Sequence, residues 1–412
     1  MNRAVITGLG ICASIGRGRQ AVTEALQQGR SGIIHAADYA AQGLASQVCG
    51  RVTGLEQAEQ AIDRKLRRFM GAGSVWAYHS ALEALTDAGL SVQSVRQQPR
   101  CGVLASSGAT STRSFVDALA EHHRGGLRQV RPYHVPRTMT STVAAGVATA
   151  LGIEGLSYGL VSACASSLNN VGHAAELIAL GKQDLLLAGG GEEESWAESL
   201  LFDAMGALST RHNDQPERAS RPYDRDRDGF VIAGGGGMVV VESLAHAEAR
   251  GARILAEITG YGCRSDGADM VLPTGRGAAA AMRAALDEAA GAGVRSVDYL
   301  NTHGTATPQG DLAELLAIRE VFGPAAPPLS STKSMTGHSL GAAGVQELIF
   351  ALLMMEHGFI APNINLDHPD PATRGFDLVR HTRAARLDTV MTNSFGFGGI
   401  NTSLIVRRWP GS

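Results

Sequence analysis

Segments of strand length and segments of helical length alternate along the whole chain. Short apolar runs bounded by glycine or small polar residues predict buried strands at residues 3–7, 102–105, 158–162, 185–188 and 238–242. Apolar positions spaced three and four apart predict helices at residues 69–88 and 164–180. This alternation is typical of a layered α/β fold in which helices cover buried, mostly parallel sheets.

The order of elements starts again after residue 251, which indicates an internal repeat. Four segments of the second half resemble segments of the first, in the same order: residues 254–260 and 4–8, 299–304 and 103–106, 331–355 and 162–180, and 401–407 and 237–242. So long a period excludes a solenoid and fits two similar domains. We expect one half at residues 1–250, with insertions at 36–64 and 109–138, and a second half at 251–412.

Composition and charge narrow the class of protein. The chain has 412 residues, of which 44% are hydrophobic, and this is enough to bury a large core. A net charge of −3 gives no general attraction to nucleic acid or to an anionic membrane, so we expect neither as a partner. The five cysteines form no CxxC pair, and the N-terminus has no signal-peptide pattern, which favours a cytoplasmic protein.

One cysteine lies where a predicted strand runs into a predicted helix. Small residues surround Cys164 in the run Ser-Ala-Cys-Ala-Ser-Ser at residues 162–167. We expect Cys164 in the first helical turn, where unpaired N–H groups and the helix dipole favour a thiolate. A buried, inert cysteine is the competing interpretation, because most free cysteines are of that kind.

Two histidines favour a site over an inert thiol. His303 lies in Asn-Thr-His-Gly-Thr-Ala-Thr and His338 in Lys-Ser-Met-Thr-Gly-His, and each motif follows a predicted strand. Open α/β sheets place their sites beyond the carboxyl ends of strands, so both imidazoles are candidates for one site with Cys164. A fourth motif, Asn-Ser-Phe-Gly-Phe-Gly-Gly at residues 393–399, lets backbone N–H groups approach a ligand closely.

Two segments resemble known ligand-binding loops, one for phosphate and one for calcium, but do not fit them. The glycines of residues 396–399 miss the spacing of a phosphate-binding loop, and a predicted strand rather than a helix follows them. Residues 224–229 have the alternating acids that open a calcium-binding loop, but the twelfth position is Gly235 instead of glutamate. We therefore expect no bound metal.

Together the four motifs resemble the β-ketoacyl-[acyl-carrier-protein] synthases, over nearly the whole chain. Residues 62–65 and 344–347 are closest to the type I elongating synthase of bacterial fatty-acid synthesis. The resemblance implies the thiolase fold, an α/β fold of two pseudo-symmetric halves in five layers, α-β-α-β-α, and a homodimer. It also implies decarboxylative Claisen condensation of an enzyme-bound acyl thioester with malonyl-[acyl-carrier protein], giving 3-oxoacyl-[acyl-carrier protein] and CO2 in fatty-acid elongation or a related polyketide-like pathway.

The resemblance gives the candidate residues their roles. Cys164 would carry the acyl chain, and the N–H groups of Cys164 and Phe397 would bind the oxyanion, with Phe397 also gating the pocket. His303 and His338 would donate hydrogen bonds to the enolate left by decarboxylation. The resemblance also implies three supporting roles. Lys333, paired with Glu314, would tune the electrostatic environment of the site. Thr305 and Thr307 would bind the phosphopantetheine arm, and Met139 and Phe202 would line the acyl pocket.

Substrates carried on the phosphopantetheine arm of acyl carrier protein require no separate cofactor. That carrier is acidic, so the resemblance implies a basic docking surface. The densest basic cluster contains Arg64, Lys65 and Arg68, and Arg128 is a candidate extension. An ordinary solvated helix face is the alternative interpretation of such a cluster.

Other functions stay open at this point. A catalytically silent partner subunit that determines chain length would lack the nucleophile. A thiolase would have a second cysteine where this chain has His338, and a starter-unit synthase would have asparagine there. A Cys-His hydrolase on another fold would release free fatty acid without consuming malonyl groups. Residues 166–170 differ from the usual type I pattern, so the sequence does not define the preferred chain length.

Overall fold

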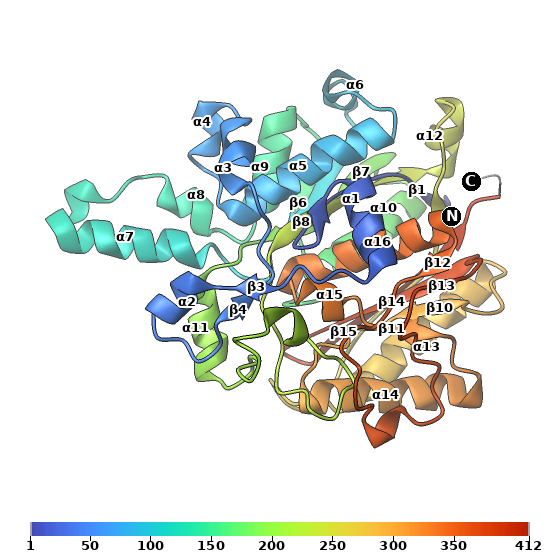
Figure 1. The fold of residues 1–412 in the computed structure, drawn as a ribbon. Helices are drawn as coiled ribbons and strands as arrows, with labels where there is room; N and C mark the ends of the chain where they lie inside the picture. Colours follow the sequence, from blue (N-terminus) through green and yellow to red (C-terminus); the bar gives the residue numbers. More distant parts are fainter. Residues whose placement is uncertain (1, 411–412) are drawn as a thin grey trace.

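The computed structural model describes residues 2–410 (Figure 1). Its central strands are β1 (Ala4–Ala13), β2 (Gly16–Arg17), β5 (Cys101–Ser106), β6 (Ser157–Tyr158), β7 (Leu185–Glu192), β8 (Gly235–Ser243), β9 (Ala256–Ser265), β10 (Tyr299–Asn301), β11 (Leu329–Ser330), β14 (Thr389–Gly396) and β15 (Ile400–Arg408). Two short ribbons lie outside this set, β3 (Ile34–His35) with β4 (Val48–Cys49), and β12 (Phe359–Ile360) with β13 (Arg383–Ala384).

The helices of the first half are α1 (Arg19–Gln28), α2 (Ala37–Ala41), α3 (Leu55–Gln60), α4 (Arg64–Arg67), α5 (Ala72–Asp87), α6 (Val92–Arg96), α7 (Thr112–Gly125), α8 (His134–Thr138), α9 (Thr142–Leu151), α10 (Ser166–Ala179), α11 (Trp196–Ala204) and α12 (Leu244–Ala249). Those of the second half are α13 (Arg276–Gly291), α14 (Pro308–Phe322), α15 (Lys333–Thr336) and α16 (Ala343–His357). Every helix within residues 2–410 is too short or too polar to span a bilayer.

The order of strands is the same on either side of the β1–β9 pair. From β1 it runs β8, β7, β5, β6, and from β9 it runs β15, β14, β10, β11. These equivalences pair β1 with β9, β8 with β15, and β5 with β10, as the similar segments of the sequence do. The two pseudo-symmetric halves are therefore confirmed, whereas the boundary at residue 250 stays a prediction.

The expectation of mostly parallel sheets is wrong at the centre. In each half the strands joined through helices are parallel, such as β5 with β7 and β10 with β14. The central pairs β1–β8, β7–β8, β9–β15 and β14–β15 are antiparallel. A short turn joins β14 directly to β15, and such a connection allows only antiparallel pairing.

Helices separate and cover the two half-sheets (Figure 1). α5 and α9 pack on the outer face of the first half-sheet, and α13, with α14 beside it, covers the second. α10 and α16 pack on each other between the half-sheets. α16 is apolar on nearly all sides and buried from Ala343 to Met355, as expected of a helix enclosed in a core.

Candidate active site

Cys164 lies in a sharp turn between β6 and α10. Ala163 adopts a left-handed backbone conformation with φ of 50°, which residues other than glycine rarely occupy. The Ser166 hydroxyl accepts a hydrogen bond from the Ser162 N–H (2.9 Å) and donates one to the Ala163 carbonyl (2.6 Å). β6 ends at Tyr158, and α10 begins only at Ser166. The predicted placement of Cys164 in the first helical turn is therefore wrong, because the left-handed turn ends before the helix starts.

The glycine-rich loop after β14 packs against this turn. A Cβ atom on Gly396 would lie 2.9 Å from the Ser162 carbonyl oxygen and 3.1 Å from the Cys164 nitrogen, so only glycine fits there. The close approach brings the Phe397 N–H to the Cys164 sulfur. This N–H and that of Cys164 itself both favour the negatively charged sulfur.

The Cys164 thiol nevertheless keeps its proton at neutral pH. Burial raises the pKa of Cys164 to about 12, against the opposing charge of Lys333 and the two N–H groups. The charge of Glu192 adds to the effect of burial. Burial therefore opposes the thiolate that the sequence predicts, because the loss of solvation outweighs the charge of Lys333 and the two N–H groups.

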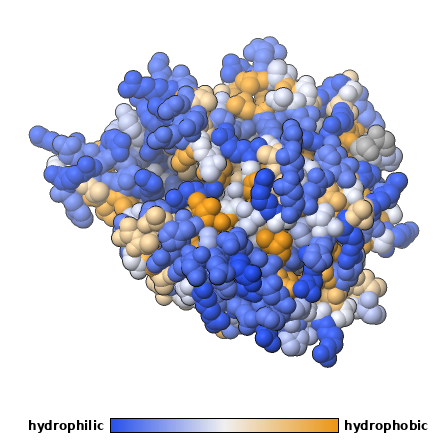
Figure 2. All heavy atoms as spheres, in the orientation of Figure 1, coloured by the Kyte–Doolittle hydropathy of each residue, from blue (hydrophilic) through white to orange (hydrophobic). Residues whose placement is uncertain are grey.

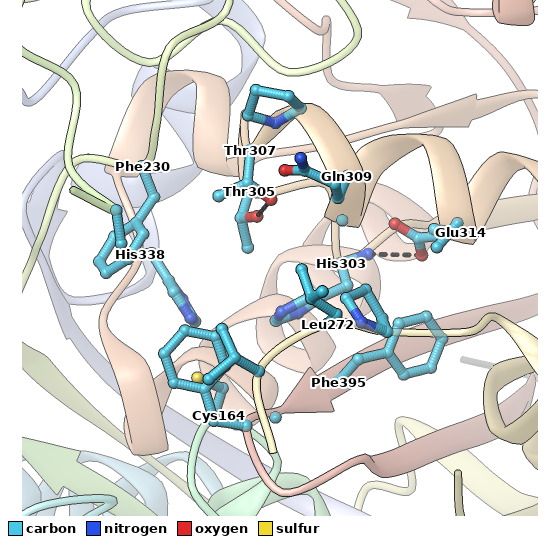
Figure 3. A pocket seen from close by; sticks show the side chains of 18 of the residues that line it. Cys164, Phe230, Leu272, His303, Thr305, Thr307, Gln309, Glu314, His338 and Phe395 are labelled. Atoms are coloured by element: carbon cyan, nitrogen blue, oxygen red, sulfur yellow. Dashed lines mark hydrogen bonds between the residues drawn. The ribbon is translucent and has the colours of Figure 1, made fainter. Parts of the chain in front are cut away.

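His303 and His338 lie together above Cys164, one from each of two loops of the second half (Figure 3). Their ring centroids are 5.2 Å apart and their planes meet at 86°. Phe230 supports the His338 ring edge to face at 5.5 Å, and Phe395 contacts the His303 ring at 5.7 Å. Burial, and secondly the charge of Lys333, holds the pKa of both imidazoles well below its usual range. Both rings are therefore neutral and able to donate an N–H.

The predicted pairing of Lys333 with Glu314 is wrong. Lys333 Nζ lies 2.6 Å from Glu347 Oε1, and both side chains are buried. Glu314 instead accepts the backbone N–H groups of His303 (2.8 Å) and Gly304 (2.7 Å), so it fixes the backbone that carries the imidazole. Sequence reasoning missed Glu347 as the partner. The available signal was a glutamate within a buried and largely apolar helix, because such a charge needs a counter-charge.

One cavity connects these groups to solvent (Figure 3). Cys164 and both histidines line it, together with Thr305 and Thr307, whose hydroxyl oxygens are 3.0 Å apart. Sequence reasoning did not predict further lining residues, among them Phe230, Leu272, Gln309 and Phe395.

The two predicted residues of the acyl pocket lie in different places. Phe202 lines the cavity of Cys164, and its ring packs 5.3 Å from Phe230 and 6.3 Å from Phe397. Met139 is 41% exposed and lines a separate, small cavity beside Glu193. Within one chain the structure therefore does not bring Met139 to the nucleophile.

The predicted docking residues also separate. Arg64, Lys65 and Arg68 are exposed on α4 and at its end, and the Arg68 guanidinium lies 5.0 Å from the centre of the Tyr133 ring. Arg128 lies in the short 3-10 helix η1 (Leu127–Gln129), beyond α7 on an arm that projects away from α4 (Figure 1). Hydrophilic side chains cover both α4 and the end of this arm (Figure 2).

Among residues 2–410, Asp224, Asp226 and His368 are close enough to share a cation. Asp224 is already engaged by the backbone N–H groups of Asp226 and His368 and by Arg221. The expectation of no bound metal stays a prediction.

Both halves of the chain match models of one family. The N-terminal domain of β-ketoacyl synthase matches residues 1–247, and its C-terminal domain matches residues 255–367. The chain belongs to the β-ketoacyl synthase family. The synthase is thus an acyltransferase, and the resemblance of the four motifs is confirmed.

Known relatives align with this synthase over nearly its full length. It is 54% identical to 3-oxoacyl-[acyl-carrier-protein] synthase 1 of Escherichia coli (strain K12), over 99% of each chain. A β-ketoacyl synthase from Burkholderia phymatum STM815 superposes with a TM-score of 0.93 at 39% identity, covering 100% of both chains. A type II PKS ketosynthase in complex with its acyl-carrier protein, AntDE:AntF, matches with a TM-score of 0.88 at 30% identity over 99% of this chain and 100% of that one. These ketosynthases have the thiolase fold, so that prediction is confirmed.

Proposed function

We propose that this synthase condenses an acyl group held on Cys164 with malonyl-[acyl-carrier protein], releasing CO2 and 3-oxoacyl-[acyl-carrier protein] in fatty-acid elongation. The observation that carries the proposal is the shared cavity of one thiol and two neutral imidazoles. A thiol suits acyl transfer, and neutral N–H donors suit a developing enolate. No cofactor enters this chemistry.

The first half-reaction loads the nucleophile. The Cys164 sulfur bonds to the carbonyl carbon of the incoming thioester, and the pantetheine sulfur leaves with the proton of the Cys164 thiol. The negative oxygen of the tetrahedral intermediate accepts hydrogen bonds from the N–H groups of Cys164 and Phe397, which already face the sulfur. Preformed donors of this kind contribute about 3 kcal/mol each to transition-state stabilisation.

The second half-reaction forms the new carbon–carbon bond. The bond between the malonyl carboxylate and its α-carbon breaks, CO2 leaves, and the electron pair forms an enolate. His303 and His338 donate N–H hydrogen bonds to the enolate oxygen, and their lowered pKa keeps both rings neutral. The enolate carbon then attacks the acyl carbonyl, the bond to Cys164 breaks, and the sulfur takes up a proton from solvent.

Acyl carrier protein is the proposed partner. The hydroxyls of Thr305 and Thr307 line the cavity and would bind the phosphopantetheine arm. Arg64, Lys65 and Arg68 offer exposed positive charge to an acidic carrier. The carrier-bound ketosynthase AntDE:AntF supports the same kind of partner.

A homodimer is the proposed assembly. Phe115, Leu119 and Val135 on the arm of α7 and α8 are 59%, 47% and 69% exposed, and Figure 2 shows hydrophobic patches among the hydrophilic side chains of this arm. β6, at the edge of the sheet, is also exposed. A second copy would cover both features, and would bring a second Met139 to an acyl pocket. Light scattering should give twice the chain mass; a monomeric mass would contradict the proposal.

The cytoplasmic location stays a prediction.

The test of the function uses purified enzyme with acyl-carrier protein and malonyl-carrier protein. We expect equal amounts of CO2 and 3-oxoacyl product, and neither from Cys164→Ala. Absence of 3-oxoacyl product from the wild-type enzyme, with Cys164 intact, would contradict the proposal and favour the non-catalytic partner subunit.

A further inference from the structure

Glu198 is a buried carboxyl group without a hydrogen-bond partner in residues 2–410. It is 1% exposed, and neither of its carboxyl oxygens is hydrogen-bonded. The Glu198 side chain does not cap the N-terminus of α11, because the Ser195 hydroxyl does so by accepting the Glu198 N–H (3.3 Å). Buried polar groups of native proteins nearly always have partners, so an unpaired carboxyl group points to a ligand.

The helical position of Glu198 relates it to the active-site cavity. Glu198, Phe202 and Met205 are spaced four and three residues apart in and directly after α11, and therefore share one face. Phe202 and Met205 line the cavity of Cys164. Glu198 continues this face one turn past Phe202, a distance of about 6 Å along the helix axis.

The surroundings of Glu198 determine its protonation. Burial raises the pKa of Glu198 well above its usual range, and the charges of Glu192, Glu193 and Glu194 act in the same direction. Both effects favour the protonated carboxyl group, which has one O–H to donate. An alkyl chain packed against this O–H would leave it unpaired, whereas an oxygen atom on the chain would accept its hydrogen bond.

We propose that Glu198 is a specificity-determining residue, which donates a hydrogen bond to a hydroxyl or oxo oxygen on the acyl chain held by Cys164. The inference rests on the proposed function, since that chain would extend along the α11 face beyond Phe202. It names the substrate class as acyl chains that carry oxygen at one defined distance from the thioester. Saturated chains long enough to reach Glu198 are disfavoured.

A positional series of substrates tests the inference on the wild-type enzyme. The series consists of acyl-carrier proteins of one chain length, either saturated or with a single hydroxyl group moved carbon by carbon along the chain. We expect one hydroxyl position at which kcat/KM exceeds that of the saturated chain by about tenfold or more. A donor at a fixed position can form a hydrogen bond only with an oxygen on one particular carbon of the chain. A flat series, or a preference for the saturated chain throughout, would overturn the inference.

Two substitutions assign the effect to the carboxyl group. Glu198→Leu should remove the positional maximum and raise kcat/KM for the saturated chain, whereas Glu198→Gln, which still donates an N–H, should retain the maximum. Glu217→Leu makes the same exchange at an exposed carboxylate and should leave the series unchanged. A maximum that persists in Glu198→Leu would overturn the inference, and if this variant does not fold, the wild-type series decides. Failure of the wild-type enzyme to condense any chain would count against the proposed function instead.

Discussion

The imidazole rings of His303 and His338 meet edge to face, with centroids 5.2 Å apart, in the cavity that also contains the Cys164 sulfur. Two neutral rings so close together present two N–H donors to one small region. The arrangement suits an oxygen atom that gains negative charge while carbon–carbon bonds break and form.

Removal of either imidazole should separate the two half-reactions. His303→Ala or His338→Ala should lower CO2 release from malonyl-carrier protein by about 100-fold or more, the usual loss for one oxyanion donor. Acylation of Cys164 should change only severalfold, because it uses the backbone N–H groups of Cys164 and Phe397. Radiolabelled CO2 and single-turnover acylation measure the two steps, with exposed His381→Ala as the control. Equal losses in both steps would contradict these roles.

The charge of Lys333 should set the acid limit of decarboxylation. Its positive charge contributes to the low pKa of His303 and His338, so the wild-type rings stay neutral as the pH falls below 6.5. Lys333→Met should raise the pKa of both rings, so that activity is lost at a higher pH on acidification. The pH profile of CO2 release checks the direction, and an unchanged acid limb would contradict it.

The buried Lys333–Glu347 pair gives a stability prediction. Glu347→Leu leaves the Lys333 ammonium buried without its counter-charge, and should lower the free energy of unfolding by about 3–5 kcal/mol. The double variant Lys333→Met, Glu347→Leu should recover most of that loss, since neither charge of the pair is then present. Urea unfolding measures both values; a double variant as unstable as the single one would exclude the ion-pair explanation.

Alkylation of Cys164 should show a protonated resting thiol. Because burial raises the pKa of Cys164 to about 12, the thiolate fraction grows about tenfold per pH unit across the neutral range. The rate of iodoacetamide labelling should therefore rise with unit slope from about pH 7 to 9. Cys164→Ala serves as the control for labelling of Cys263, which is also partly exposed. A plateau near neutral pH would indicate a thiolate instead.

Charge reversal on α4 tests carrier docking. Lys65→Glu with Arg68→Glu should raise KM for acyl-carrier protein and leave kcat/KM for a small acyl thioester nearly unchanged, since both residues are exposed and lie outside the cavity. The loss should shrink at high salt. Equal effects on both substrates would contradict a docking role.

Sequence patterns predicted the halves and the site motifs well, because both depend on local order. The segments that resemble each other occupy equivalent strands, such as β1 with β9, and the motifs of His303 and His338 end in one cavity. Small residues beside these motifs leave room for a ligand to approach the site, and such residues can be recognised in the sequence.

Features that depend on tertiary structure could not be predicted from the sequence in the same way. The left-handed turn at Ala163 has no glycine to mark it, so the sequence pattern predicts too early a start for α10. The sequence predicts Glu314 as the partner of Lys333, and only the packing of α16 shows that Glu347 takes this place. The antiparallel centre of the sheet follows from connections whose direction no periodicity encodes.

Mass spectrometry of the acylated enzyme tests the central claim most directly. Incubation with acyl-carrier protein alone should add one acyl group, and peptide mapping should locate it on Cys164; added malonyl-carrier protein should then remove it as 3-oxoacyl product with one CO2 released. Condensation at an undiminished rate in Cys164→Ala, or an acyl group found on another residue, would contradict the account.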